Sequence, residues 1–312
     1  MGSISFVILN YKIWQESVAC AESILQTQTY GNYSIVIVDN GSGNDSAERL
    51  RAHFAQEKRV SVVASEENLG FARGNNLGIA YARDQFDPDF IVVANSDIIF
   101  EQPDYCEELV NIYKRKRYDI LGGDIVDAGR MKHLNPVARE RSYSLSYMRK
   151  QVLVSWAKSV IFRLIRLLHL KKAVAGHYGL TADENGIYTA DGSKNLTTRE
   201  VAGRSVAADE RMEHQLPGVL LHGCCLIFSR DFFKGQQGFY DKTFLYAEEE
   251  ILYYLALKKN QTVLYSPKIV CVHKEGVSTK ALKKDFFDAK IFYFSHITHS
   301  YRIFLELMKE YE

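Results

Sequence analysis

The first 130 residues alternate short, almost wholly apolar runs with longer amphipathic stretches, and this alternation restricts the fold more than any other feature of the chain. The apolar runs are Ser5–Leu9, Ser34–Val38, Val60–Ala64 and Phe90–Ala94. The stretches between them are Gln15–Gln26, Ser46–Gln56 and Phe71–Arg83. Apolar runs of about five residues are typical of strands buried on both faces. Their spacing predicts βαβ units, and therefore an α/β fold with a twisted, mainly parallel sheet flanked by helices.

Polar residues come directly after these predicted strands. Asn10 and Tyr11 follow the first strand, Asp39 and Asn40 the second, and Asn95, Ser96 and Asp97 the fourth. In open α/β sheets, ligands bind beyond the carboxyl ends of the strands. The sequence therefore predicts a ligand site at one edge of the sheet.

A segment rich in glycine and amides, residues 68–76, follows the third strand. Gly70 and Gly74 would let backbone N–H groups approach a phosphate, and a helix start adds partial positive charge. Arg73 can pair with the same phosphate. No G-x-G-x-x-G sequence follows any predicted strand, so a dinucleotide-binding Rossmann motif is disfavoured.

Asp97 stands directly after a buried strand, with Asn95 two residues earlier. Hard divalent cations prefer oxygen ligands, which both side chains offer. Taken by itself, an N-x-D sequence after a strand is weak evidence for a metal site, because a turn or a helix cap explains it better. The polar segments after the neighbouring strands favour a metal site that meets a bound diphosphate.

Composition and charge exclude several other classes of protein. The formal net charge is +1, and the basic residues are not interleaved with stacking aromatic residues, so nucleic acid is not an expected partner. The 5 cysteines are an odd number without C-x-x-C spacing, which predicts free thiols in a reducing, cytoplasmic compartment. No apolar run approaches the ~20 residues of a membrane span. The N-terminus shows no charged leader typical of a signal peptide.

The pattern changes after residue 130. Between Arg141 and Ala182 there are eight Lys or Arg and no acidic residue. Strand-like runs return at Cys225–Phe228, Val263–Tyr265 and Ile269–Val272, and an aromatic-rich helix is expected over Ala281–Tyr311. We therefore divide the chain into a first half of the α/β domain (1–130), a basic helical and loop insertion (131–215), a second half (216–280) and a C-terminal helix (281–312).

The segment Gln151–Leu168 is amphipathic at the helical period. Its apolar side consists of Leu153, Trp156, Val160, Ile161, Leu164 and Leu168. Its polar side consists of Gln151, Ser155, Lys158, Ser159, Arg163 and Arg166, with Phe162 as the one apolar exception on that side. Two interpretations stay open: the helix packs on the sheet domain, or it lies in a membrane interface with its basic residues toward anionic headgroups.

Seven motifs occur in an order that resembles the family 2 glycosyltransferases, especially their bacterial rhamnosyltransferase-like branch. In the N-terminal half they are Asn10-Tyr11, Val38–Ser42, Asn68–Asn76 and Asn95–Asp97. Further along they are Gly223–Arg230, Phe239–Glu249 and Val272-His273 with Ser278. The resemblance covers residues 4–125 and 217–280. It implies a GT-A fold in which residues 1–130 bind the nucleotide sugar and residues 216–280 carry acceptor binding and catalysis.

The resemblance also implies a role for each matching residue. Asn10, Tyr11, Asp39 and Asn40 would lie near the base and ribose of the donor, and Asn68, Gly70, Arg73 and Asn75 near its ribose and diphosphate. Asn95 and Asp97 would face the diphosphate, where Asp97 would hold Mg²⁺ or Mn²⁺ and His273 would reach the metal or the leaving phosphate. Glu249 would be the general base, while Glu248 and Gly223 would bind the acceptor or the donor sugar. His222 lies outside the matching motifs, but its position directly before Gly223 makes it a further candidate for acceptor binding.

Two positions depart from the family pattern. Asn95 occupies the first acidic position of the usual D-x-D motif, and Ile251 stands where the second acid of the E-D-x-D pattern is expected. Glu248, Glu249 and Glu250 are three candidate bases in a row. Such a run also opens a helix simply to complement its dipole.

The implied activity is that of an inverting hexosyl- or deoxyhexosyltransferase acting on a glycan or lipid-linked acceptor in bacterial surface polysaccharide synthesis. A sugar nucleotidyltransferase is one alternative, but that class has a Gly-rich loop where this chain has Asn10–Trp14. A non-catalytic nucleotide-sugar-binding protein is the other, and Asp97 together with Glu248 and Glu249 argues against it. An anionic membrane, at the inner face of the cell, and a second copy of the chain are further expected partners.

Overall fold

A computed structural model describes residues 2–129, 132–139, 142–183, 187–190, 214–274 and 285–312. Ser278, part of one predicted motif, lies outside these ranges, as do the first residues of the predicted C-terminal helix. The chain forms two compact units. The sheet unit comprises Met1–Arg141, Gly203–Phe244 and Glu248–Gly276, and the helical unit comprises Ser142–Ala202, Leu245–Ala247 and Val277–Glu312.

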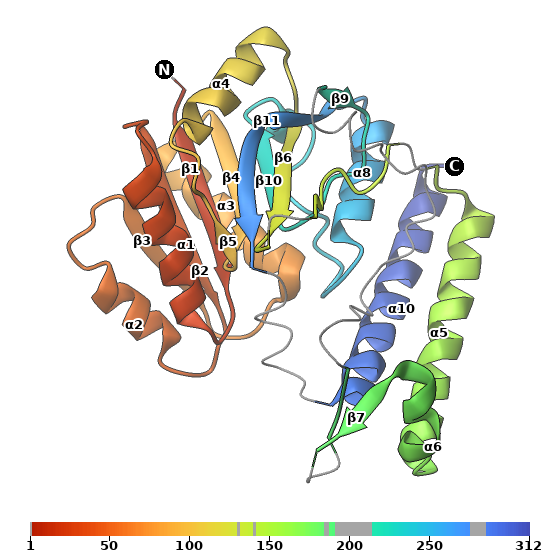
Figure 1. The fold of residues 1–312 in the computed structure, drawn as a ribbon. Helices are drawn as coiled ribbons and strands as arrows, with labels where there is room; N and C mark the ends of the chain where they lie inside the picture. The colour runs from red at the N-terminus through yellow and green to blue at the C-terminus, as the bar shows by residue number, and fades with distance from the viewer. Residues whose placement is uncertain (1, 130–131, 140–141, 184–186, 191–213, 275–284) are drawn as a thin grey trace. The chain divides into compact units, whose positions relative to one another are not determined.

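Four parallel strands form the N-terminal half of the sheet unit, as the sequence predicts (Figure 1). They are β1 (Ile4–Asn10), β2 (Tyr33–Asn40), β3 (Val60–Ser65) and β4 (Phe90–Asn95). Their order is β3-β2-β1-β4. Asn10 is in register with Asp39, and Leu9 with Asn95. The polar residues at the three strand ends therefore lie at one edge of the sheet.

The rest of the sheet is mixed, so the prediction of a mainly parallel sheet holds only for its first half. The remaining strands are β5 (Ile98–Ile99), β6 (Ile120–Asp127), β9 (Leu216–Pro217), β10 (Cys225–Ser229) and β11 (Val263–His273). β10 runs antiparallel to both β4 and β6, and β11 runs parallel to β6 and antiparallel to β5 and β9. An apolar run shows that a strand is buried but not its direction.

The single strand β11 contains both Val263–Tyr265 and Ile269–Val272, which the sequence predicts as two separate strand-like runs. Its register against β6 shifts between Ser266 and Val270. Pro267 lies in this interval, and a proline has no N–H to donate to a neighbouring strand. The strand continues beyond the irregularity, so His273 pairs with Ile98, directly after Asp97.

Helices cover both faces of the sheet. One core contains side chains of α1 (Trp14–Thr27), α2 (Ser46–His53) and α4 (Tyr105–Arg115). The other contains side chains of α3 (Gly70–Phe86) and α8 (Glu248–Lys258). Successive residues of β1 serve opposite cores, since Phe6 belongs to the first and Val7 to the second. Gly78 brings α3 close to the sheet, because a Cβ there would lie 2.4 Å from Val7 Cγ1.

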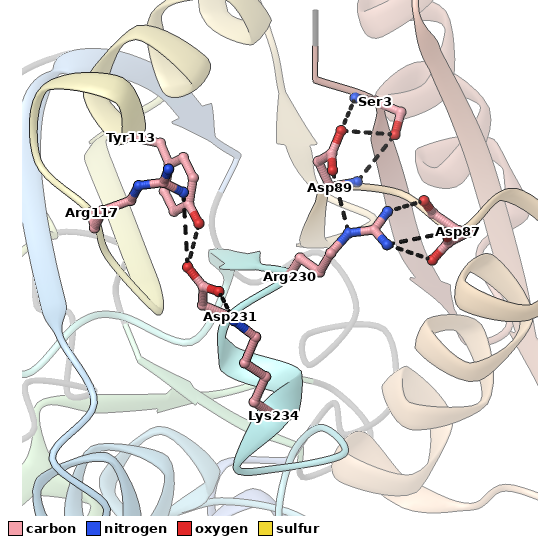
Figure 2. A network of polar contacts seen from close by, with 8 residues as sticks. All are labelled: Ser3, Asp87, Asp89, Tyr113, Arg117, Arg230, Asp231 and Lys234. Carbon is pink, nitrogen blue, oxygen red and sulfur yellow. Dashed lines mark hydrogen bonds and ion pairs between the residues drawn. The ribbon is translucent and has the colours of Figure 1, made fainter.

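A polar network lies at the opposite edge of the sheet from the strand ends discussed above (Figure 2). Arg230, directly after β10, donates to Asp87 at 3.0 Å and contacts Asp89 at 3.3 Å. Asp89 in turn accepts from the backbone N–H of Ser3 at 2.9 Å. The network fixes the end of antiparallel β10 to the beginnings of β1 and β4. Because its charges are largely exposed, each pair contributes little by itself.

The helical unit is built on α5 (Leu145–Leu167) and α10 (Phe286–Glu310), which lie side by side and antiparallel (Figure 1). Shorter elements follow α5: α6 (Lys171–Ala175), a 3₁₀ turn (Gly176–Tyr178), β7 (Leu180–Ala182) and β8 (Tyr188–Ala190). Ser144 caps α5 by accepting from the N–H of Tyr147. In the described residues no helix is long and apolar enough to span a bilayer.

Candidate active site

A buried network joins the ends of β1 and β2. The Asn10 side-chain amide donates to Asp39 Oδ1 at 2.6 Å, and the Ser42 hydroxyl donates to the same oxygen at 2.5 Å. The Ser17 hydroxyl donates to Asn10 Oδ1 at 2.9 Å. These bonds orient Asp39, whose other oxygen receives a 3.4 Å contact from the Ser42 N–H. Tyr11 is partly exposed beside this network, with Lys12 Nζ 5.2 Å from its ring centroid.

Asn40 holds the glycine-rich loop in place. Its amide donates to the Gly70 carbonyl at 3.0 Å and to Asn68 Oδ1 at 3.2 Å, while its oxygen accepts from the Leu69 N–H at 3.0 Å. Asn68 Oδ1 also accepts from the Gly70 N–H at 2.9 Å. Both ends of the Asn40 side chain are therefore engaged by the loop itself, a role that the sequence did not indicate.

Gly70 opens α3 in a conformation that other residues rarely adopt. Its φ is +78°, and a Cβ at this position would lie 2.2 Å from the Phe244 carbonyl oxygen. The next residue, Phe71, donates its N–H to that carbonyl at 2.8 Å. The glycine therefore permits a close backbone contact between the loop and the segment that precedes α8 in sequence.

The first turns of α3 present two of the predicted donor residues. Arg73 is exposed and makes no ion pair with a described residue. Asn75 is buried; its amide donates to the Phe71 carbonyl at 3.0 Å, and its Oδ1 has no hydrogen-bond partner among the described residues. Asn76, which the sequence did not single out, exchanges two 2.8 Å hydrogen bonds with the backbone of Phe239.

Asp97 and His273 come together at the junction of β4, β5 and β11. Asp97 Oδ2 lies 3.3 Å from His273 Nε2, and the Asp97 carbonyl accepts from the Lys274 N–H at 3.0 Å. His273 Nδ1 is buried and has no hydrogen-bond partner within the described ranges. Asn95 is half-buried, and its backbone N–H donates to the Cys224 carbonyl at 2.9 Å. The two predicted metal ligands are therefore neighbours, although they are far apart in sequence.

His222 lies next to this pair. Its ring centroid is 6.1 Å from that of His273. Its backbone N–H donates to Asn135 Oδ1 at 2.9 Å, and the Asn135 amide donates to the Gly123 carbonyl at 2.7 Å. Asn135 is fully buried and links β6 to the His222 backbone, and nothing in its local sequence marks this role.

Glu249 completes the arrangement from the first turn of α8. A Cβ on Gly223 would lie 3.6 Å from Glu249 Oε2, so the two residues adjoin. Glu249 is half-buried, whereas Glu248 and Glu250 are buried. Gly223 precedes Cys224, which bonds to Asn95, and the glutamate therefore lies on the same rim as the β4 end.

Comparison with known proteins identifies the family. The profile described as Glycosyl transferase family 2 matches residues 5–172, more than half of the chain, so the chain belongs to this family. A glycosyltransferase GlyG of Streptococcus pneumoniae is 34% identical over 121 residues, 39% of this chain and 38% of that protein. The low-salt glycan biosynthesis hexosyltransferase Agl10 of Haloferax volcanii is 27% identical over 127 residues, 41% of this chain and 38% of that protein. The chain thus matches less than half the length of these relatives.

The fold prediction is confirmed by a solved structure. Crystalline GalNAc-T7 with UDP, GalNAc and Mn²⁺ superposes with a TM-score of 0.55 at 13% identity, covering 88% of this chain and 44% of that chain. This likeness establishes the GT-A fold. The rhamnosyltransferase-like branch stays a prediction.

Proposed function

We propose that the chain is an inverting glycosyltransferase that moves a sugar from a nucleoside-diphosphate donor to a hydroxyl of a glycan or lipid-linked acceptor. The observation that carries this proposal is the half-buried Glu249 beside Gly223, on the rim that also holds Asp97 and His273. A candidate base and a candidate pair of metal ligands thus lie on one rim of the sheet. Residues 1–130 would bind the donor, and residues 216–280 the acceptor.

The donor side is supported by oriented polar groups. Asp39, fixed by Asn10 and Ser42, can accept from a base or a ribose hydroxyl through Oδ2. Arg73 has its guanidinium exposed at a helix start, where a diphosphate is favoured by both charge and backbone N–H groups. The GalNAc-T7 structure carries ligands of the same kinds, a nucleoside diphosphate, a sugar and a divalent cation.

A divalent cation fits the residues present. Asp97 and His273 would hold Mg²⁺ or Mn²⁺, since a buried carboxylate and an imidazole nitrogen meet at 3.3 Å and the other imidazole nitrogen has no hydrogen-bond partner in the part of the chain that the structure describes. No group of three or more His, Cys, Asp or Glu in the described residues forms a metal site alone, so diphosphate oxygens would complete the shell. When bound, the cation stabilises the negative charge that develops on the departing diphosphate.

The chemical step then belongs to Glu249. An acceptor hydroxyl has to lose its proton as its oxygen attacks the anomeric carbon, and a carboxylate within hydrogen-bond reach contributes typically ~10²–10⁴-fold. The transition state is expected to resemble an oxocarbenium ion. A single displacement inverts the anomeric centre. Glu248, His222 and Gly223 would shape the acceptor side.

All five cysteines are buried free thiols, which agrees with a reducing compartment and supports action at the cytoplasmic side of a cell.

A panel of nucleotide sugars tests the proposal. Transfer, or slow hydrolysis without acceptor, releases a nucleoside diphosphate from one donor in the panel. Release of a nucleoside triphosphate in the presence of pyrophosphate would instead identify a nucleotidyltransferase. Saturable binding of a nucleotide sugar without any turnover would identify a non-catalytic binding protein.

A further inference from the structure

Exposed apolar side chains are concentrated in one short segment of the helical unit. Of the eleven large apolar residues that are exposed in the described part of the chain, eight lie between residues 153 and 170. They are Leu153, Val154, Trp156, Ile161, Leu164, Leu167, Leu168 and Leu170. Exposure reaches 62% for Leu153 and 70% for Leu167. Scattered apolar residues are normal on a protein surface, but a contiguous group marks an interaction site.

The helix α5 packs on α10 through its polar side, contrary to what its amphipathic pattern alone would suggest. Ser159 Oγ lies 3.2 Å from Ser295 Oγ, and Phe162 stacks on Phe294 with ring centroids 5.7 Å apart. The other buried residues of α5 are Met148, Ser155 and Ile165. Figure 1 shows the two helices side by side. The apolar side of α5 therefore is not used to pack against α10.

The residues Leu153, Trp156, Ile161, Leu164, Leu167 and Leu168 share this outward side, which we name the α5 apolar face. At about 100° per residue, they fall within one stripe that lies opposite Ser155, Ser159 and Phe162. Trp156 is 48% exposed near one border of the stripe. Indole rings are favoured where an apolar and a wet environment meet.

Free positive charge lies at both ends of the α5 apolar face. Arg149 and Lys150 precede it on the same side of the helix, and Lys172 follows it. These three side chains are exposed and form no ion pair with a described residue. By contrast, Arg166 pairs with Asp288 of α10 at 3.0 Å, and Arg163 donates to Ser295 at 2.9 Å. Arg166 is therefore neutralised by an acid of α10, whereas the three basic residues at the ends of the apolar stripe have no acidic partner among the described residues. Lys158 and Arg163 have none either, but their side chains contact Phe294 and Ser295 of α10.

We propose that the α5 apolar face lies in the interface of an anionic lipid bilayer. A second copy of the chain fits less well. Pairing two such faces in either direction would bring the basic ends of one helix onto basic residues of the other, and Arg141–Ala182 contains no acidic residue to neutralise them. Anionic headgroups supply that neutralisation, while the apolar stripe enters the acyl boundary. This inference is independent of the proposed function, since a chain can dock on a membrane without transferring a sugar.

Co-sedimentation of the full chain with phosphatidylglycerol–phosphatidylcholine vesicles tests the apolar contribution. The wild type should bind at low salt and release as salt rises. The triple variant Leu153→Gln, Leu164→Gln, Leu167→Gln should bind at least ~10-fold more weakly, because apolar burial drives interfacial binding. These positions are exposed, so circular dichroism should show an intact fold. The matched control Phe86→Gln, Leu257→Gln changes residues that are 40% and 45% exposed elsewhere and should bind like the wild type.

Charge is tested separately. Arg149→Ser with Lys150→Ser should weaken binding roughly 5-fold per charge on anionic vesicles, and far less on pure phosphatidylcholine. Lys114→Ser with Lys116→Ser, two exposed lysines of the sheet unit, is the control and should have no effect. Failure of the wild type to bind anionic vesicles at low salt overturns the proposal. The proposal is also overturned if sedimentation velocity shows that the wild type dimerises, and if the leucine variant no longer dimerises but still binds vesicles like the wild type.

Discussion

At the scale of single residues, burial separates three consecutive glutamates that the sequence distinguishes only through a family resemblance. Glu248 and Glu250 are buried, whereas Glu249 is half-buried with its carboxylate beside Gly223. A general base has to come within hydrogen-bond reach of the proton that it takes from the substrate. The partly exposed Glu249 is open to a ligand, which supports it over its two buried neighbours as the proposed base.

Replacement of these glutamates, one at a time, distinguishes a base from a structural residue. Glu249→Gln keeps the size of the side chain but cannot take the acceptor proton, so turnover should fall by roughly 10²-fold or more while donor affinity changes little. Initial rates and donor affinity are measured with one donor for Glu248→Gln, Glu249→Gln and Glu250→Gln. If Glu249→Gln turns over normally while Glu248→Gln or Glu250→Gln is inactive, the general base is the neighbouring glutamate and not Glu249.

The pair Asp97–His273 makes metal dependence testable by binding alone. Nucleoside-diphosphate affinity should be higher with Mn²⁺ than with a chelator for the wild type. Asp97→Ala and His273→Ala should each lose at least about 10-fold of the metal-dependent increment, because each removes one of the two proposed protein ligands, and even residues that only support a ligand typically contribute that much. Calorimetry gives both affinities. His53→Ala, an exposed histidine distant in sequence, serves as control. An undiminished increment in both site variants would show that the metal is held elsewhere or not at all.

At the scale of helices and strands, the first half of the sheet could be predicted because each buried strand is followed by a helix of the right length. The direction of β10 could not, since Cys225–Ser229 is apolar in either orientation. The α5 pattern shows two faces but not which one meets α10. Contacts such as Asn135 with His222 depend on chain segments far apart in sequence, and no local pattern reports them.

Gly70 links an element boundary to the site. Gly70→Ala should lower the free energy of unfolding by about 2 kcal/mol or more, because a left-handed alanine costs roughly 1–2 kcal/mol and its Cβ would also overlap the Phe244 carbonyl. Urea unfolding measures the change. Gly31→Ala is the control, since a Cβ there meets nothing within 4 Å, and its effect should stay within about 0.5 kcal/mol. Equal stability of the two variants would contradict the close approach of the loop to Phe244.

At the scale of the whole molecule, the sheet unit encloses three thiols that burial makes harder to ionise in the folded chain than in the unfolded chain. Burial raises the pKa of Cys106, on α4, from its ordinary value of 9.0 to about 12. Burial also raises the pKa values of Cys20 and Cys224 well above that ordinary value. In the unfolded chain these thiols lose their protons above about pH 9, while the folded chain keeps them. The contribution of these thiols to the free energy of unfolding is therefore fully present below about pH 9. It is lost progressively as the pH rises toward their pKa in the folded chain.

Cys106→Ala should reduce this alkaline loss of stability. Between its unfolded and folded pKa values, each such thiol lowers the free energy of unfolding by about 1.4 kcal/mol per pH unit. The variant lacks the Cys106 thiol, so its free energy of unfolding should fall less steeply with pH than that of the wild type. Urea unfolding under reducing conditions, repeated from pH 8 to about pH 10.5, gives the slope independently of the overall stability lost with the side chain. Val110→Ala, also buried on α4, should lower the stability but leave the slope unchanged, since valine does not titrate. An identical slope in Cys106→Ala and Val110→Ala would mean that the Cys106 thiolate is tolerated in the folded protein and that water reaches this core.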